Sequence, residues 1–197
     1  MRKKSIGVLA LQGAFSLHIK MINSLGFVTK EVRTPDDLTG LDALIIPGGE
    51  STTISKMMVR WELINPVKKL ISDGFPVFGT CAGLILLSEH IEHWENLPRP
   101  GGLEITVRRN AYGRQIDSFE AELNIELPGN SAEKPFTGVF IRAPRIIPES
   151  LGEKVEVLCT LEEYPVLVRQ QNILGASFHP EISGDSRIHK WFLENMI

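Results

Sequence analysis

The sequence predicts an α/β fold with three layers, in which helices flank a mostly parallel central sheet that carries additional antiparallel strands. In the first half of the chain, short and nearly continuous apolar runs alternate with segments of helical periodicity, as in parallel strands covered on both faces. In the second half, apolar and polar residues alternate along several short runs, which is typical of half-exposed strands. Such a fold binds its ligands at the carboxyl ends of the parallel strands.

The first strand is expected over residues 5–11, which are almost entirely apolar. The helix that follows ends at Gly26. Residues 27–33 predict a second strand, and residues 42–46 predict a third, buried one. The apolar residues of the helix recur at helical spacing and are Ala14, Leu17, Met21, Ile22 and Leu25.

Two further helices are expected over residues 51–59 and 65–72. The turn 73–76 then leads into a short strand that contains Val77 and Phe78. A brief apolar helix over residues 84–87 begins shortly after this strand.

The second half predicts six more strands and a closing helix that begins near Ser186. No repeat or linker interrupts the sequence, so we expect one domain over residues 1–197. The expected strands are 104–108, 119–125, 138–141, 155–158, 166–169 and 173–178. The apolar face of the closing helix consists of Ile188, Trp191, Phe192 and Met196.

Composition excludes several classes of function. Of the 197 residues 43% are hydrophobic, and the net charge of −3 gives no electrostatic footprint for nucleic acid. No segment approaches membrane-spanning length, and the first apolar run is too short for a signal peptide. Two cysteines do not make a disulfide framework. We therefore expect a cytoplasmic protein.

Residues 79–83, Gly-Thr-Cys-Ala-Gly, match the pattern of a nucleophile elbow with cysteine in place of serine. The turn places Cys81 at a helix N-terminus, whose partial positive charge favours the thiolate. Glycine at Gly79 and Gly83 removes collisions in the sharp turn, and the amide of Ala82 would face a developing oxyanion. Alternatively, Cys81 is a small buried hydrophobic residue beside a tight turn.

A cysteine nucleophile needs a base, and the base needs an orienting acceptor. His179 follows an expected strand at its carboxyl end, and Pro180 fixes the backbone after it. Glu181 can turn back to accept a hydrogen bond from the imidazole and set its tautomer. A surface His-Pro turn with a solvated glutamate is the alternative. The other histidines are interpreted as solvated residues within or at the ends of helices: His18, His90, His93 and His189.

Residues 47–52, Pro-Gly-Gly-Glu-Ser-Thr, follow a buried strand. The glycines Gly48 and Gly49 allow backbone N–H groups to turn into a pocket, as an oxyanion hole requires. A phosphate-binding loop is the rival interpretation, which the absence of a following Gly-Lys-Ser/Thr weakens. Cys159 is expected to be a thiol buried in a strand. No Cys/His grouping has zinc spacing, so we expect no metal, and we expect no cofactor.

The chain resembles the glutamine amidotransferases with a Cys-His-Glu triad, and more narrowly the family of glutaminase subunits of two-subunit pyridoxal 5'-phosphate synthases. The triad alone indicates only the wider group, whereas Glu-Ser-Thr-Thr after the glycines, Arg-Asn-x-Tyr-Gly-Arg-Gln and Ile-Arg-Ala-Pro narrow the resemblance to this family. The matching stretches cover essentially the whole chain and are residues 11–13, 47–53, 79–83, 109–115, 117–120, 140–144 and 177–181.

The resemblance implies a class-I glutamine amidotransferase-like, flavodoxin-like fold and hydrolysis of L-glutamine to glutamate and ammonia. The ammonia would pass, within a large hetero-oligomer, to a synthase subunit that makes pyridoxal 5'-phosphate from ribose 5-phosphate and glyceraldehyde 3-phosphate. Cys81 would be the nucleophile, His179 the general base and then acid, and Glu181 its orienter. Gly49 and Ala82 would form the oxyanion hole. The residues implied to bind L-glutamine are Gly49, Glu50, Ser51, Arg109, Ile141 and Arg142.

Three alternatives differ in partner or in chemistry. A glutaminase that serves a different acceptor enzyme would keep the chemistry and change only the docking surface. A cysteine peptidase-like or chaperone-like relative usually carries histidine directly after the cysteine, where this chain has Ala82. A binding module without catalysis is disfavoured because nucleophile, base and orienter are all present.

Overall fold

The computed structural model of the protein describes residues 3–109, 118–129 and 134–197. Its central sheet contains β1 (Ser5–Leu9), β2 (Val28–Val32), β3 (Ala43–Ile46), β4 (Val77–Thr80), β10 (Glu156–Leu161), β11 (Tyr164–Gln170) and β12 (Ile173–Ala176). Their order is β10-β11-β12-β4-β3-β1-β2. The strands from β12 to β2 are parallel, and β11 and β10 extend the sheet in antiparallel pairs. The mostly parallel sheet is therefore confirmed.

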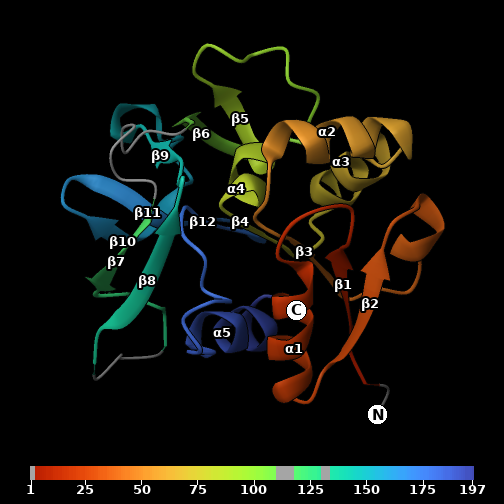
Figure 1. The fold of residues 1–197 in the computed structure, drawn as a ribbon, viewed down its shortest axis with the longest axis horizontal. Helices are drawn as coiled ribbons and strands as arrows, with labels where there is room; N and C mark the ends of the chain where they lie inside the picture. Colours follow the sequence, from red (N-terminus) through yellow and green to blue (C-terminus); the bar gives the residue numbers. More distant parts are fainter. Residues whose placement is uncertain (1–2, 110–117, 130–133) are drawn as a thin grey trace.

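Helices cover both faces of this sheet. On one face lie α1 (Phe15–Ser24) and α5 (Arg187–Asn195), and on the other lie α2 (Ser51–Arg60), α3 (Ile64–Ser72) and α4 (Ala82–Leu87) (Figure 1). Successive side chains of a strand point to opposite faces. Accordingly, Ile6 and Val8 join the core beneath α1 and α5, whereas Leu9 joins the core beneath α2 and α4. Burial on both sides explains why the strands are continuous apolar runs.

The second half adds two small sheets. One contains β5 (Ser88–Ile91), β6 (Leu103–Arg108) and β9 (Arg145–Ile146), and the other pairs β7 (Ser118–Leu123) with β8 (Phe136–Ile141). Along β6 and β8, buried residues alternate with more exposed ones, as the sequence pattern predicts. Short 3₁₀ helices span Pro35–Leu38 and Pro148–Ser150. Within the described ranges, no helix is both long and apolar enough to cross a membrane.

The structure differs from the sequence-based expectations at several boundaries and in several short elements. The first strand ends at Leu9 rather than at residue 11, and the last ends at Ala176 rather than at residue 178. Strands β5 and β9 and the two 3₁₀ helices were not predicted. Placing His90 and His93 in helices or at their ends is wrong, because His90 lies in β5 and His93 follows that strand with a φ of 62°.

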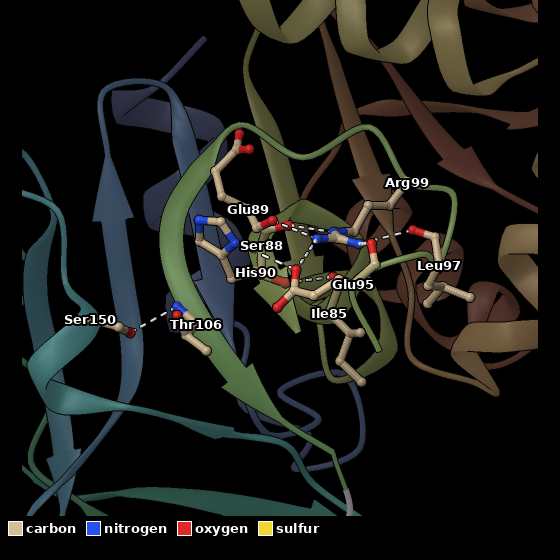
Figure 2. Close-up of polar contacts among 9 residues, drawn as sticks. All are labelled: Ile85, Ser88, Glu89, His90, Glu95, Leu97, Arg99, Thr106 and Ser150. Atoms are coloured by element: carbon tan, nitrogen blue, oxygen red, sulfur yellow. Dashed lines mark hydrogen bonds and ion pairs between the residues drawn. The ribbon is translucent and has the colours of Figure 1, made fainter. Parts of the chain in front are cut away.

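Strand β5 owes its position to Arg99, a residue that follows it in the sequence. The guanidinium of Arg99 donates hydrogen bonds to the carbonyl oxygens of Ser88 at 2.8 Å and Glu89 at 2.5 Å (Figure 2). It also donates to those of Glu95 and Leu97, at 3.2 and 2.9 Å. Its side chain is only 10% exposed. The largely buried guanidinium of Arg99 therefore links β5 to the segment that connects β5 with β6.

Replacing Arg99 with methionine is expected to lower the free energy of unfolding by about 2 to 4 kcal/mol, because four carbonyl groups, two of them in partly buried hydrogen bonds, lose a charged donor. Urea denaturation measures this change. Arg60→Met, which removes an exposed guanidinium from the end of α2, is the matched control and should stay within about 0.5 kcal/mol of the wild type. Equal stabilities for the two variants would contradict this account of β5.

Candidate active site

Cys81 lies on a sharp turn between β4 and α4. Its backbone has φ 49° and ψ −101°, a left-handed conformation that side chains rarely adopt. A Cβ added at Gly79 would lie 2.7 Å from the backbone of Gly83, and one at Gly83 would lie 1.9 Å from the carbonyl oxygen of Ile46. The expectation that this turn requires both glycines is confirmed.

His179 and Glu181 reach the same place from the neighbouring strand. Strand β12 pairs in parallel with β4, with Ala176 opposite Thr80, so the residues after both strands emerge side by side. The backbone N–H of His179 donates to the carbonyl of Val139 at 2.8 Å. Its Nδ1 lies 2.7 Å from Oε1 of Glu181, and both side chains are buried.

The electrostatics of this pair favour an imidazolium. Burial on its own would lower the pKa of His179, but hydrogen bonds to Cys81 and Glu181 and the negative charges of both groups raise that pKa to about 10. A histidine that stays protonated beside a cysteine stabilises the thiolate form of that cysteine. The arrangement can therefore supply a nucleophilic sulfur with an adjacent acid.

The glycine loop packs directly against this pair. A Cβ at Gly48 would lie 2.3 Å from Cε1 of His179 and 3.3 Å from Cβ of Cys81. The carbonyl of Gly48 accepts a hydrogen bond from the N–H of Ala14 at 3.0 Å, and a Cβ at Gly13 would lie 1.9 Å from that carbonyl oxygen. The turn after β1 and the glycine loop are therefore interlocked. The sequence placed Gly48 in this loop, but it did not show that Gly48 packs against the imidazole of His179.

Glu50 uses its carboxylate to begin α2. It accepts hydrogen bonds from the backbone N–H groups of Thr52 and Thr53 at 3.0 and 2.7 Å. Burial raises the pKa of Glu50, but these bonds and that from the Thr53 hydroxyl lower it to about 2. The N–H of Glu50 donates to Oε1 of Gln12 at 2.8 Å. Both the backbone and the side chain of Glu50 thus hold the loop in shape.

Arg109 and the end of β8 form the opposite wall. Nη2 of Arg109 lies 3.4 Å from Oε1 of Glu50, and its guanidinium carbon is 4.4 Å from the centre of the Trp94 ring. Nη1 of Arg109 is buried and has no hydrogen-bond partner among the described residues. Sγ of Cys81 lies 3.7 Å from the carbonyl oxygen of Ile141. Arg142 follows with a φ of 45°.

These groups share a pocket of about 600 Å³ at the carboxyl ends of the parallel strands. Of the predicted site residues, only Glu181, buried behind His179, and Ala82, buried at the start of α4, do not line it. The predicted residues that line it are Gly49, Glu50, Ser51, Cys81, Arg109, Ile141, Arg142 and His179. A larger cavity of about 810 Å³ beside β10 contains none of them, so the predicted site residues gather only at the smaller of these two pockets.

Comparison with known proteins agrees with this geometry. The profile of the SNO glutamine amidotransferase family matches residues 8–197. The chain belongs to this family. The pyridoxal 5'-phosphate synthase subunit PdxT of Listeria innocua is 51% identical over 194 residues, which cover 98% of this chain and 100% of that protein. The PdxT of Desulforudis audaxviator is 48% identical over 189 residues, covering 96% and 97%.

Solved structures give the same result for this member of the glutamine amidotransferase family. A structure described as a glutamine amidotransferase superimposes with a TM-score of 0.88 at 49% identity, covering 96% of this chain and 97% of that one. The structure of PurLQS from Thermotoga maritima has a TM-score of 0.67 at 18% identity and covers 98% and 97%. The second likeness indicates the fold alone.

Two histidines of this amidotransferase that were interpreted as solvated are fully buried. His18 on α1 and His189 on α5 are both 0% exposed, and Nδ1 of His18 lies 2.9 Å from Nε2 of His189. Burial lowers the pKa of His18 well below 6.5, and the charges of His189 and His179 add to this; burial lowers the pKa of His189 to about 3. Both rings are therefore neutral. The sequence did contain a sign of this burial, because each histidine shares a helix face with an apolar residue: His18 with Ile22, and His189 with Phe192.

This buried pair makes the amidotransferase sensitive to acid. The unfolded chain takes up protons at these histidines as the pH falls below about 6.5, whereas the folded chain does not. The free energy of unfolding should therefore fall as the pH drops below about 6.5, by about 1.4 kcal/mol per pH unit for each histidine that stays neutral in the folded chain. Urea denaturation at several pH values measures the slope, and His189→Phe should reduce it by the contribution of one histidine. An unchanged slope in that variant would contradict the assignment.

The remaining site predictions are simpler. Cys159 is 4% exposed within β10, and burial followed by the charge of Glu126 raises the pKa of its thiol to about 11. The prediction of a strand-buried thiol is confirmed, and both cysteines are free. Within the described ranges, no cluster of three or more His, Cys, Asp or Glu residues could hold a metal. Residues 110–115 and Asp117 of the family-like motifs lie outside the described residues.

Proposed function

We propose that this protein hydrolyses L-glutamine to L-glutamate and ammonia as the glutaminase subunit of a pyridoxal 5'-phosphate synthase. The observation that carries this proposal is the convergence of Cys81 and His179 at one pocket, with Glu181 bonded to the imidazole from behind. The family match and the identity of about half of all residues to PdxT proteins support the acceptor enzyme. The whole chain, residues 1–197, acts as one glutaminase domain in a cytoplasmic protein.

The reaction is acyl transfer through a thioester. The thiolate of Cys81 attacks the side-chain amide carbon of glutamine, and backbone N–H groups of Gly49 and Ala82 hold the oxyanion. The imidazolium of His179 gives its proton to the departing ammonia and then takes one from the water that attacks the thioester. Glu181 keeps the imidazole in the orientation that both steps need. The sum is one glutamine and one water converted to one glutamate and one ammonia.

The residues around the thiolate hold the α-carboxylate and α-amino group of glutamine. Arg109 lines this pocket, its buried Nη1 has no hydrogen-bond partner among the described residues, and a guanidinium binds a carboxylate in a fixed geometry. Arg142, Ile141 and Ser51 complete the wall. Glu50 contributes indirectly, because its carboxylate contacts Arg109 and caps α2.

Arg109→Lys is expected to raise the KM for glutamine by about 10- to 100-fold and to change kcat much less, because a lysine cannot reproduce the stacked guanidinium. Steady-state kinetics of glutamate release measure both constants. Lys56→Met, one turn after Thr52 in α2 and exposed, serves as the control for a lost positive charge. A fall in kcat with an unchanged KM would show that Arg109 does not bind the substrate.

Docking to the synthase is expected to activate the glutaminase, because ammonia released into bulk water is lost. The interlocked Gly13 and Gly48 are the parts that would move, and the Gln12 contact to Glu50 would follow them.

The deciding experiment measures glutamate release from L-glutamine with and without the pyridoxal 5'-phosphate synthase subunit, beside a Cys81→Ala control. Activity that rises with the partner and disappears in the variant supports the proposal. If activity is lost in the variant but does not depend on this partner, the protein is still a glutaminase, but it serves a different acceptor enzyme. No release under either condition refutes it.

A further inference from the structure

Glu181 carries a second carboxylate oxygen that the His179–Glu181 pair does not use. Oε1 accepts from Nδ1 of His179, but Oε2 is buried and has no well-aligned hydrogen bond to any described residue. A buried carboxylate oxygen without a donor is costly. Nε2 of His18 lies 3.3 Å from this oxygen, and both side chains are 0% exposed.

The proton positions around His18 follow from its neighbours. An ionised carboxylate only accepts hydrogen bonds, and Nε2 is the ring nitrogen of His18 that lies within 3.3 Å of both Glu181 and Thr80, so the tautomer of the neutral His18 that suits this carboxylate carries its proton on Nε2. Nδ1 of His18 must then accept from Nε2 of His189, 2.9 Å away. This leaves Nδ1 of His189 as a bare acceptor, and that atom is indeed buried without a hydrogen-bond partner in the described part of the chain.

The opposite tautomer is unfavourable at both ends. It would aim the Nε2 lone pair of His18 at the carboxylate and leave an unpaired N–H on the buried Nδ1 of His189. Nε2 of His18 also lies 3.3 Å from Oγ1 of Thr80. Oγ1 of Thr80 in turn accepts from the N–H of Gly48 at 3.1 Å. The imidazole of His18 thus contacts both the carboxylate of Glu181 and the hydroxyl of Thr80, which accepts a hydrogen bond from the glycine loop.

We propose that His18 is a positioning residue, which holds the second carboxylate oxygen of Glu181 through its Nε2–H in a tautomer set by His189. The inference rests on the proposed function, because Glu181 matters through its action on His179. We expect the hydrogen bond between Nε2 of His18 and Glu181 to become better aligned when glutamine is bound, as hydrogen bonds in unliganded sites often do. The neighbouring groups that face His18 are His189 on α5, Thr80 at the end of β4, and His179 and Glu181 after β12.

The tautomer is tested first on the unaltered protein. ¹⁵N NMR of the imidazole nitrogens of His18 should show a neutral ring protonated at Nε2. A ring protonated at Nδ1, or at both nitrogens, overturns the proposal. This measurement depends neither on glutaminase activity nor on the folding of any variant.

The second test follows the alkylation of Cys81 by iodoacetamide as a function of pH. In His18→Leu, Glu181 loses a hydrogen bond to its charged form and holds the imidazolium less well. The acid limb of the alkylation rate should therefore move upward by about one pH unit. His18→Gln, whose amide can donate from a similar position, should recover at least half of this shift. In the synthase complex, His18→Leu should lower kcat for glutamine about 10- to 100-fold without raising KM.

Ile22→Ala is the matched control, because it removes a buried side chain from the same helix without touching Glu181. It should lower the melting temperature yet keep the wild-type alkylation profile. A folded His18→Leu protein with an unchanged acid limb overturns the proposal. A wild-type protein that shows the expected tautomer and alkylation profile but releases no glutamate refutes the proposed function and leaves the role of His18 intact.

Discussion

Replacing Cys81 with glycine is expected to abolish glutamine hydrolysis and at the same time to stabilise the fold. The loss of activity should be on the order of 10⁴-fold or more, because the thioester cannot form. The gain arises because φ 49° and ψ −101° strain any residue with a Cβ. Relative to Cys81→Ala, which is equally inactive but keeps the strain, Cys81→Gly should be more stable by about 1 to 2 kcal/mol.

Urea denaturation of the two variants, together with glutamate release, separates the two effects. Both lack the sulfur, so their difference in stability reports the backbone alone. If Cys81→Gly is no more stable than Cys81→Ala, the elbow holds no strain. Residual hydrolysis in either variant would mean that Cys81 is not the nucleophile.

The Gly48→Ala variant is expected to lose glutaminase activity by about 10³-fold or more, because its methyl group occupies the space of the imidazole. The added Cβ would lie 2.3 Å from Cε1 and 2.9 Å from Nδ1 of His179. Displacing the ring breaks its contacts with both Cys81 and Glu181. Alkylation of Cys81 by iodoacetamide at neutral pH should slow in parallel, since the thiolate loses its counter-ion.

Gly26→Ala provides the comparison for this variant. Gly26 has a φ of 86°, and a Cβ there would meet nothing within 4 Å. This substitution should therefore cost stability through backbone strain alone and leave both activity and alkylation near wild-type values. Retention of activity in Gly48→Ala would show that the glycine loop moves away from His179 in the working enzyme.

The features that the sequence predicted correctly are those encoded within a few consecutive residues. The elbow at Cys81 depends on Gly79 and Gly83, whose contacts lie within the turn or on the strand beside it. The alternation of burial in β6 and β8 is likewise a local pattern. The meeting of Cys81 with His179 was also foreseeable, because both follow buried strands and parallel strands end at the same edge.

The features that the sequence did not reveal depend on contacts between distant segments. Ser88 and Glu89 follow an apolar helix without any local stop signal, and Arg99 fixes them as a strand. The burial of His18 depends on His189, which lies 171 residues away in the chain. Periodicity shows that a histidine shares a helix face with apolar residues, but it does not show which polar group on a neighbouring helix or strand will contact that histidine.

The parallel register of β4 and β12 has a consequence for how the site can open. Both strands lie inside the sheet, flanked by β3 and β11, and interior strands exchange their amide hydrogens only in openings that cost close to the full unfolding energy. Arg109 and Arg142 lie beyond the ends of β6 and β8, outside this interior. Any opening of the site that leaves this interior intact must therefore involve the wall of Arg109 and Arg142, rather than the two strands that carry the sulfur and the imidazole.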